Sequence, residues 1–137
     1  MKYLLFTLLL LFTSLNLYSI NEDKSKKLNC KPFLKGSFFD YSQLENSKHI
    51  IKRFDDNSYI YDLDGTTIIV KSKLEIVKNC ILKFKIYELN NPSLSNKQKE
   101  EVMAFNSIEE IYKIEGNTAY YRGLNCKCKG YYVKFEE

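Results

Sequence analysis

Four cysteines carry the most reactive side chains of this chain, at Cys30, Cys80, Cys126 and Cys128. In an exported chain they predict two disulfides, with three possible connectivities. We prefer the disulfide pairing of Cys30 with Cys80 and of Cys126 with Cys128. In the alternative, one of Cys126 and Cys128 pairs with Cys30 and the other with Cys80. A zinc site is disfavoured because paired C-x-x-C knuckles are missing. Redox catalysis at Cys126-Lys127-Cys128 is also disfavoured, because redox motifs usually have two residues between their cysteines. No metal or other cofactor is therefore expected.

A second motif, residues 62–66 (DLDGT), resembles the nucleophile loop of haloacid-dehalogenase-type phosphatases. In that loop the first aspartate attacks phosphorus and the second acts as acid and base beside magnesium, which is chemistry that carboxylates can perform. The phosphatase fold requires a parallel strand before the loop and a helix after it, whereas here an alternating strand pattern continues through residues 67–77. Asp64-Gly65 is instead predicted to form the type I′ turn of a hairpin.

The remaining catalytic residue types do not form a recognisable set. His49 is the single histidine, and a serine or cysteine nucleophile normally needs a base that a third group orients. The sequence therefore predicts a protein that is not an enzyme. Arg53 alternates with Ile51 and could point into or out of the fold. We favour a structural pairing of Arg53 with a carboxylate over recognition of an acidic ligand. Glu110 shares its parity with Tyr112, which predicts an inward carboxylate.

Aromatic side chains are abundant, with eleven tyrosines and nine phenylalanines but no tryptophan. Aromatic residues are first of all good sheet formers and core fillers. A small barrel that they line can also enclose an apolar ligand. The candidate ligand-binding residues are Arg53, Tyr61, Phe84, Tyr112 and Tyr121.

The N-terminus has the pattern of a secretory signal peptide over residues 1–19, with a basic Lys2, a leucine-rich run and a predicted cut after Ser19. The apolar run is shorter than the roughly 20 residues that span a bilayer, so no stable membrane span is expected after cleavage. Residues 20–29 read as a flexible polar leader and residues 30–137 as a single β domain. We therefore expect an exported protein, periplasmic or extracellular.

The charge pattern argues against nucleic-acid binding. The formal net charge is only +4, and the lysines alternate with apolar residues along the predicted strands. Such alternation is typical of solvated sheet faces rather than of a basic patch.

The stretch 66–89 is the centre of the predicted fold, because it reads as two alternating strands joined by a tight turn at Lys78-Asn79. Successive side chains of a strand point to opposite faces, so a period of two predicts one buried and one solvated face. This is the pattern of an antiparallel sheet. The predicted inward residues are Ile68, Val70, Leu74, Ile76, Cys80, Leu82, Phe84 and Ile86.

Shorter strand patterns flank this pair, at residues 31–41, 49–54, 59–63, 107–115, 118–124 and 129–136. Ser95 and Gln98 form a predicted capping box at the start of one helix, residues 96–105, with Val102 and Phe105 facing the sheet. The predicted fold class is mainly β: an antiparallel meander of about eight strands, curled into a lipocalin-like barrel or half-barrel, with one short helix.

Several short motifs lie in the first two thirds of the chain, namely Cys30, Phe33, Gly36-x-Phe38, Ile51-x-Arg53 and the block 73–89 with its Asn79-Cys80. Together they resemble a family of small exported bacterial β-rich proteins of unknown function, sometimes mislabelled as topoisomerase. That family favours a tryptophan before the central cysteine and a Cys-x-Tyr after it, where this chain has Ile76 and Leu82. The resemblance implies an exported β fold and brings no activity.

Two functions from different classes remain. The first is a lipocalin-like binding protein that holds a small apolar or amphipathic ligand in an aromatic-lined cup, with the helix as a lid. It predicts a cavity of roughly 300 Å³ or more. The second is a structural or interaction module of the cell envelope with a protein partner. It predicts a packed interior and an exposed aromatic patch or an open edge strand.

Overall fold

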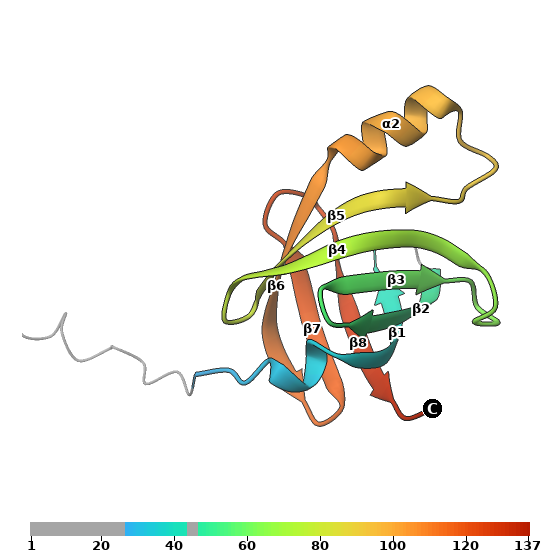
Figure 1. Cartoon of the computed structure of the whole chain (residues 1–137). Helices are drawn as coiled ribbons and strands as arrows, with labels where there is room; N and C mark the ends of the chain where they lie inside the picture. The colour runs from blue at the N-terminus through green and yellow to red at the C-terminus, as the bar shows by residue number, and fades with distance from the viewer. Residues whose placement is uncertain (1–26, 44–46) are drawn as a thin grey trace, which may run out of the picture.

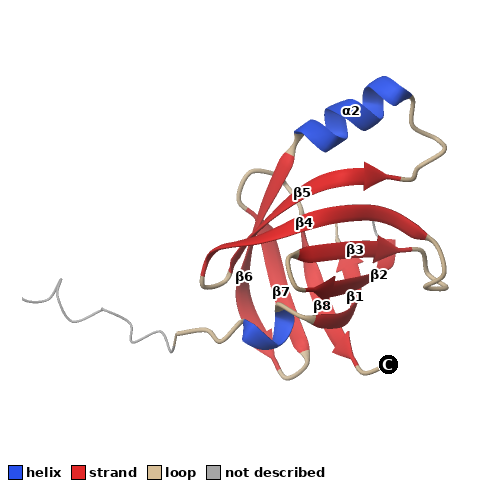
Figure 2. Cartoon of the chain, in the orientation of Figure 1, coloured by secondary structure: helices blue, strands red, loops and turns tan. Residues whose placement is uncertain are grey.

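The structure is a computed structural model that describes residues 27–43 and 47–137; the predicted signal peptide lies outside the described residues. Strands dominate this part of the chain (Figure 2). The eight strands within it are β1 (Gly36–Ser42), β2 (Ser47–Phe54), β3 (Asn57–Tyr61), β4 (Ile68–Lys78), β5 (Ile81–Leu89), β6 (Asn106–Glu115), β7 (Thr118–Gly123) and β8 (Lys129–Phe135). A 3-10 helix, η1 (Lys31–Phe33), precedes β1, and one α-helix, α2 (Asn96–Ala104), connects β5 to β6.

The strands form a closed antiparallel barrel (Figure 1). Each strand pairs with the next in sequence, and β8 pairs with β1 from Ser37 opposite Phe135 to Ser42 opposite Gly130. A Cβ on Gly130 would overlap the carbonyl oxygen of Tyr41 and lie 2.7 Å from the hydroxyl oxygen of Tyr121. Glycine is therefore needed where the two ends of the sheet meet. The predicted mainly-β fold is confirmed, as a full barrel rather than a half-barrel.

The buried apolar core takes at least one side chain from every described strand except β3, together with Cys30 and Phe33. Phe38, Leu82 and Ala119 are completely buried, and Ile111 is 1% exposed. Along β4, the buried residues Ser72 and Leu74 alternate with the exposed residues Lys73 and Glu75, so the period-two pattern separates a buried face from a solvated one there.

The chain before β1 differs from the predicted strand at residues 31–41. Pro32 stands in the first turn of η1, where its fixed φ suits a helical start, and Phe33 is buried beneath the barrel wall. β1 begins only at Gly36, whose φ of 119° is open to glycine alone. The disulfide between Cys30 and Cys80 ties this segment to the turn between β4 and β5.

The connection between β3 and β4 also differs from the predicted two-residue turn. It is a longer loop, in which Asp62 Oδ1 accepts hydrogen bonds from the backbone N–H groups of Thr66 at 3.1 Å and Thr67 at 3.2 Å. Asp64 Oδ1 accepts from the same Thr66 N–H at 2.9 Å, and Gly65 has a φ of 74°. Both carboxylates are thus used to shape a loop between antiparallel strands, a context that does not match the phosphatase loop.

Helix α2 begins at the predicted capping box. The Gln98 N–H donates to Ser95 Oγ at 3.2 Å, and the Ser95 N–H donates to Gln98 Oε1 at 2.9 Å. The helix ends at Ala104, one residue before the predicted end, and Val102 and Phe105 remain 40% and 48% exposed. No helix of residues 27–43 and 47–137 is both long and apolar enough to cross a membrane.

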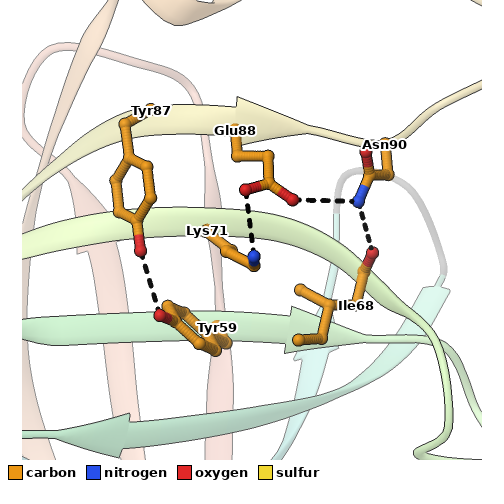
Figure 3. A network of polar contacts seen from close by, with 6 residues as sticks. All are labelled: Tyr59, Ile68, Lys71, Tyr87, Glu88 and Asn90. Carbon is orange, nitrogen blue, oxygen red and sulfur yellow. Dashed lines mark hydrogen bonds and ion pairs between the residues drawn. The ribbon is translucent and has the colours of Figure 1, made fainter.

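Among the described strands, β4 is the only one that pairs with the far end of β5, because the ladder between β5 and β6 ends at Lys85 opposite Asn106. Figure 3 shows the polar contacts on this outer surface: Lys71 pairs with Glu88 at 2.9 Å, and the Tyr87 hydroxyl donates to the Tyr59 hydroxyl at 3.0 Å. The hydrogen bond to Tyr59 is the main cause that raises the pKa of Tyr87 to about 12. These contacts fix β5 in place where it runs past β6 towards α2.

Candidate functional site

A cavity of about 130 Å³ lies inside the barrel. More polar than apolar side chains line it. Its apolar wall consists of Ile51, Ile60, Val70, Phe84 and Ile86, and its polar wall of Asp40, Arg53, Ser58, Ser72, Ser107, Glu109 and Tyr132.

Arg53 is the one cation of this wall, and the alternation of β2 places it there. Lys52 lies on the outer surface, so Ile51 and Arg53 face inward, where Arg53 is only 2% exposed. Its Nη1 donates to the carbonyl oxygen of Phe33 at 2.8 Å, whereas Nε and Nη2 are buried without a hydrogen-bond partner. A backbone carbonyl thus takes the place of the carboxylate that we expected as a structural partner.

Aromatic rings surround the Arg53 guanidinium. Its Cζ lies 4.3 Å from the ring centroid of Tyr132, 5.1 Å from that of Phe38 and 5.5 Å from that of Phe84. Cation–π contact stabilises a charge through the face of a ring and does not use the N–H donors, which lie in the guanidinium plane. The charge is therefore partly stabilised while the edge formed by Nε and Nη2 keeps its hydrogen-bonding capacity.

Two carboxyl groups in the interior are held by tyrosines. The Tyr132 hydroxyl donates to Glu109 Oε2 at 2.5 Å, and the Tyr121 hydroxyl donates to Asp40 Oδ1 at 2.9 Å. Burial raises the pKa of Glu109 above its ordinary value, although the hydrogen bond from Tyr132 and the charge of Arg53 act in the opposite direction. Burial also raises the pKa of Tyr121 and of Tyr132, so both hydroxyls remain donors.

The five candidate ligand-binding residues do not come together as one group. Arg53 and Phe84 line the cavity. Tyr121 is buried in the interior, where it stacks on Tyr132 with 4.3 Å between ring centroids. Tyr61 and Tyr112 are not lining residues. The first lies on the outer surface with Lys52 Nζ 5.4 Å from its ring centroid, and the second is 48% exposed beneath Arg122.

The error at Tyr112 comes from a bulge in β6. The register shifts between Ile111 and Lys113, so Tyr112 has no partner on β7 and the parity of the strand changes there. Before the bulge the inward positions are Glu109 and Ile111. The inward Glu110 that we expected is thus also wrong: Glu110 lies on the outside and pairs with Arg122 at 2.8 Å.

The error at Tyr61 comes from the polar character of the interior. β3 turns Ser58 and Ile60 towards the cavity, and Ser58 is 3% exposed. A strand whose inward positions include serine shows no clear alternation of apolar and polar residues, so its faces are assigned wrongly from hydropathy. Sequence reasoning missed Asp40, Ser58, Ser72, Ser107, Glu109 and Tyr132 for this reason. The available signals were the parity that Asp40 shares with Phe38 in β1 and the parity that Ser72 shares with Val70 and Leu74 in β4.

A second hollow lies beneath α2. It measures about 480 Å³ and is mostly apolar, with Ile86, Leu94, Gln98, Glu101, Val102, Phe105 and Ser107 as its lining residues. We call it the α2 groove. Ile86 and Ser107 also line the cavity, so the two hollows adjoin.

The four cysteines are paired with one another in the structure. Cys30 is bonded to Cys80, as preferred, and the structure also pairs Cys126 with Cys128, whose Cα atoms lie 5.3 Å apart. Within residues 27–43 and 47–137 no three metal-binding side chains come close enough together to hold an ion.

Comparison with known proteins identifies no matching family model, no matching curated protein and no matching solved structure. The resemblance to exported bacterial β-rich proteins therefore stays a prediction.

Proposed function

We propose that this chain is an exported, non-enzymatic binding protein of lipocalin-like shape, and that its ligand presents a hydrogen-bond acceptor to Arg53 inside the barrel. The observation that carries the proposal is the guanidinium on the cavity wall, whose Nε and Nη2 are buried without a partner. A buried donor without a partner costs about 1–3 kcal/mol. A bound acceptor would recover that free energy, so the site favours occupancy by a ligand.

The cavity narrows the kind of ligand. At about 130 Å³ it is well below the 300 Å³ that we expected for an apolar ligand held in an aromatic cup. Its serines, carboxyl groups and Arg53 are suited to a polar group. The proposal is therefore that the polar end of an amphipathic ligand, rather than a whole apolar molecule, enters the barrel.

The envelope interaction module has less support. Closure of the barrel through β1 and β8 leaves no open edge among the described strands for a partner strand to join. Exposed apolar side chains such as Leu63, Ile76 and Leu124 belong to different connections and strand ends, and single exposed apolar residues are common on soluble proteins.

Native mass spectrometry of the protein purified from its own host tests the proposal. We expect the native mass to exceed the denatured mass by a small discrete adduct. The adduct should be lost in Arg53→Met and retained in Lys52→Met, a matched change of the neighbouring outward cation. A wild-type chain without an adduct, or an adduct that persists in Arg53→Met, would contradict the proposed function.

A further inference from the structure

The cavity and the α2 groove meet at one place in the barrel wall. Their shared residues, Ile86 and Ser107, stand at the end of the ladder between β5 and β6, whose last pair is Lys85 and Asn106. Beyond this pair β5 continues to Leu89 beside β4, and the chain then returns through α2 to β6; Figure 1 shows α2 over this end of the sheet. The groove and the cavity therefore adjoin at the point where β5 and β6 separate.

The two hollows have opposite chemical character. Val102 and Phe105 line the groove from one face of the helical segment, since they are three residues apart, and both stay 40% or more exposed. The only charged side chain among the described residues of the groove is Glu101. The cavity instead contains Arg53 together with Asp40 and Glu109, whose carboxyl groups accept hydrogen bonds from Tyr121 and Tyr132. An anionic group is thus disfavoured in the groove, whereas in the cavity it can bind the Nε and Nη2 donors of Arg53, which have no partner.

The volumes of the cavity and of the α2 groove also indicate which part of a ligand each can hold. An apolar protein cavity of about 150 Å³ holds a molecule of the size of benzene. The 130 Å³ cavity therefore takes a head group and the first few carbons, and a longer tail must lie outside it. The groove of about 480 Å³ is the adjoining space, and it is lined by aliphatic and aromatic side chains.

The free donors of Arg53 select the head group. Nη1 is used by the Phe33 carbonyl, and Nε and Nη2 are the two remaining donors. Their N–H groups lie parallel on one edge of the guanidinium, and this fork matches the two oxygens of a carboxylate. Because Asp40 and Glu109 also line the cavity, a head group with one negative charge fits better than a phosphate with nearly two.

We infer that the ligand is a monocarboxylic acid with a hydrocarbon tail: its carboxylate binds the Nε and Nη2 edge of Arg53, and its tail lies in the α2 groove. This inference rests on the proposed function and adds the ligand class to it.

Isothermal titration calorimetry on the purified, oxidised chain tests the inference with butanoate, hexanoate, octanoate and decanoate, each below its micellar concentration. We expect binding to tighten about fourfold for each added methylene until the groove is full, because each buried CH₂ contributes about 0.8 kcal/mol. Octylamine and octan-1-ol, with the same tail but a different head group, should bind at least tenfold more weakly than octanoate.

Matched variants separate the head from the tail. Arg53→Met should weaken octanoate binding by roughly 10- to 100-fold, the usual value of a hydrogen bond to a charged group, while Lys52→Met should leave it unchanged. Val102→Ser should weaken octanoate several-fold without affecting butanoate. Val77→Ser, which changes a valine that is 54% exposed outside the groove, should affect neither.

The possible results distinguish the inference from the proposed function. If butanoate and octanoate bind equally well and both depend on Arg53, the tail does not lie in the α2 groove. The proposed function would then still stand. Equal or tighter binding of octylamine or octan-1-ol would overturn the carboxylate head group. If no carboxylate binds although native mass spectrometry detects an Arg53-dependent adduct, only the inference fails; if neither is observed, both fail.

Discussion

Replacement of Arg53 by methionine should change the stability of the empty protein very little, even though the side chain is only 2% exposed. Methionine keeps an unbranched apolar stem of similar reach and removes the charge and all the donors. Buried arginines in structural ion pairs behave differently, because removing one partner leaves an uncompensated charge and costs about 3–5 kcal/mol. The size of the effect therefore separates a ligand-binding arginine from a structural one.

The magnitude follows from the contacts of the guanidinium. The variant loses the hydrogen bond from Nη1 to the Phe33 carbonyl, worth about 1.5–3 kcal/mol, and the contacts with the rings of Tyr132, Phe38 and Phe84, together worth about 2 kcal/mol. The variant gains stability because Nε and Nη2 are no longer buried without partners, and each such donor costs about 1–3 kcal/mol. The two sides nearly cancel, so we expect the free energy of unfolding to stay within about 2 kcal/mol of wild type.

Urea unfolding of the oxidised chain, followed by circular dichroism, measures this difference. Leu82→Ala is the positive control, because Leu82 is completely buried and its truncation should cost about 2–5 kcal/mol. If Arg53→Met lowers the free energy of unfolding by about 3 kcal/mol or more, while the slope of that free energy with urea concentration stays the same, Arg53 is part of the structural framework. The assignment of its Nε and Nη2 edge to a ligand would then be wrong.

Three further predictions concern the framework around the site. Burial raises the pKa of Glu109 above its ordinary value of 4.5, so the native state retains a proton that the unfolded chain releases. The free energy of unfolding should then fall as the pH rises from 4.5 through the native pKa, and urea titrations across this window should find no such fall in Glu109→Gln. Replacing Cys30 and Cys80 together by alanine should cost about 4 kcal/mol, because their disulfide closes a loop with a sequence separation of 50; thermal unfolding that matches wild type would refute this. Gly130→Ala should lower the free energy of unfolding by several times the ~1 kcal/mol of an average substitution, since its Cβ would overlap the Tyr41 carbonyl. If the variant unfolds at the same urea concentration as the wild type, β1 and β8 are not paired as described.

The sheet was predictable from the sequence because the central strands β4 and β5 have one apolar and one charged face. The β4–β5 hairpin illustrates this, as Leu74 and Leu82 are buried while Lys73 and Lys83 form ion pairs on the outside. The helix was predictable for a local reason, since Ser95 and Gln98 satisfy each other's backbone N–H groups.

Closure of the barrel could not be decided from these local patterns. It depends on the pairing of β1 with β8, between residues almost a whole domain apart, and on the close approach at Gly130. A glycine in a strand indicates a close contact or a bulge but does not say which segment approaches it.

The site was predictable only in part, because its most informative residues are polar ones that face inward. Hydropathy assigns Ser58 and Glu109 to the outside, whereas both line the cavity. The bulge at Tyr112 then reversed the parity of the second half of β6, which no period-two pattern can anticipate. Arg53 was recognised as a candidate because it alternates with Ile51, but its free donors follow only from three-dimensional contacts.

The central claim is that the buried edge of Arg53 binds the ligand, and the ¹H–¹⁵N signal of its Nε–H group tests this most directly. The signal can be assigned by its loss in Arg53→Lys and followed during a titration with octanoate. We predict a downfield shift of the Nε proton that saturates with the calorimetric Kd, as expected for a new hydrogen bond to a carboxylate. An Nε–H signal that stays in place while signals of the α2 groove move would contradict the account.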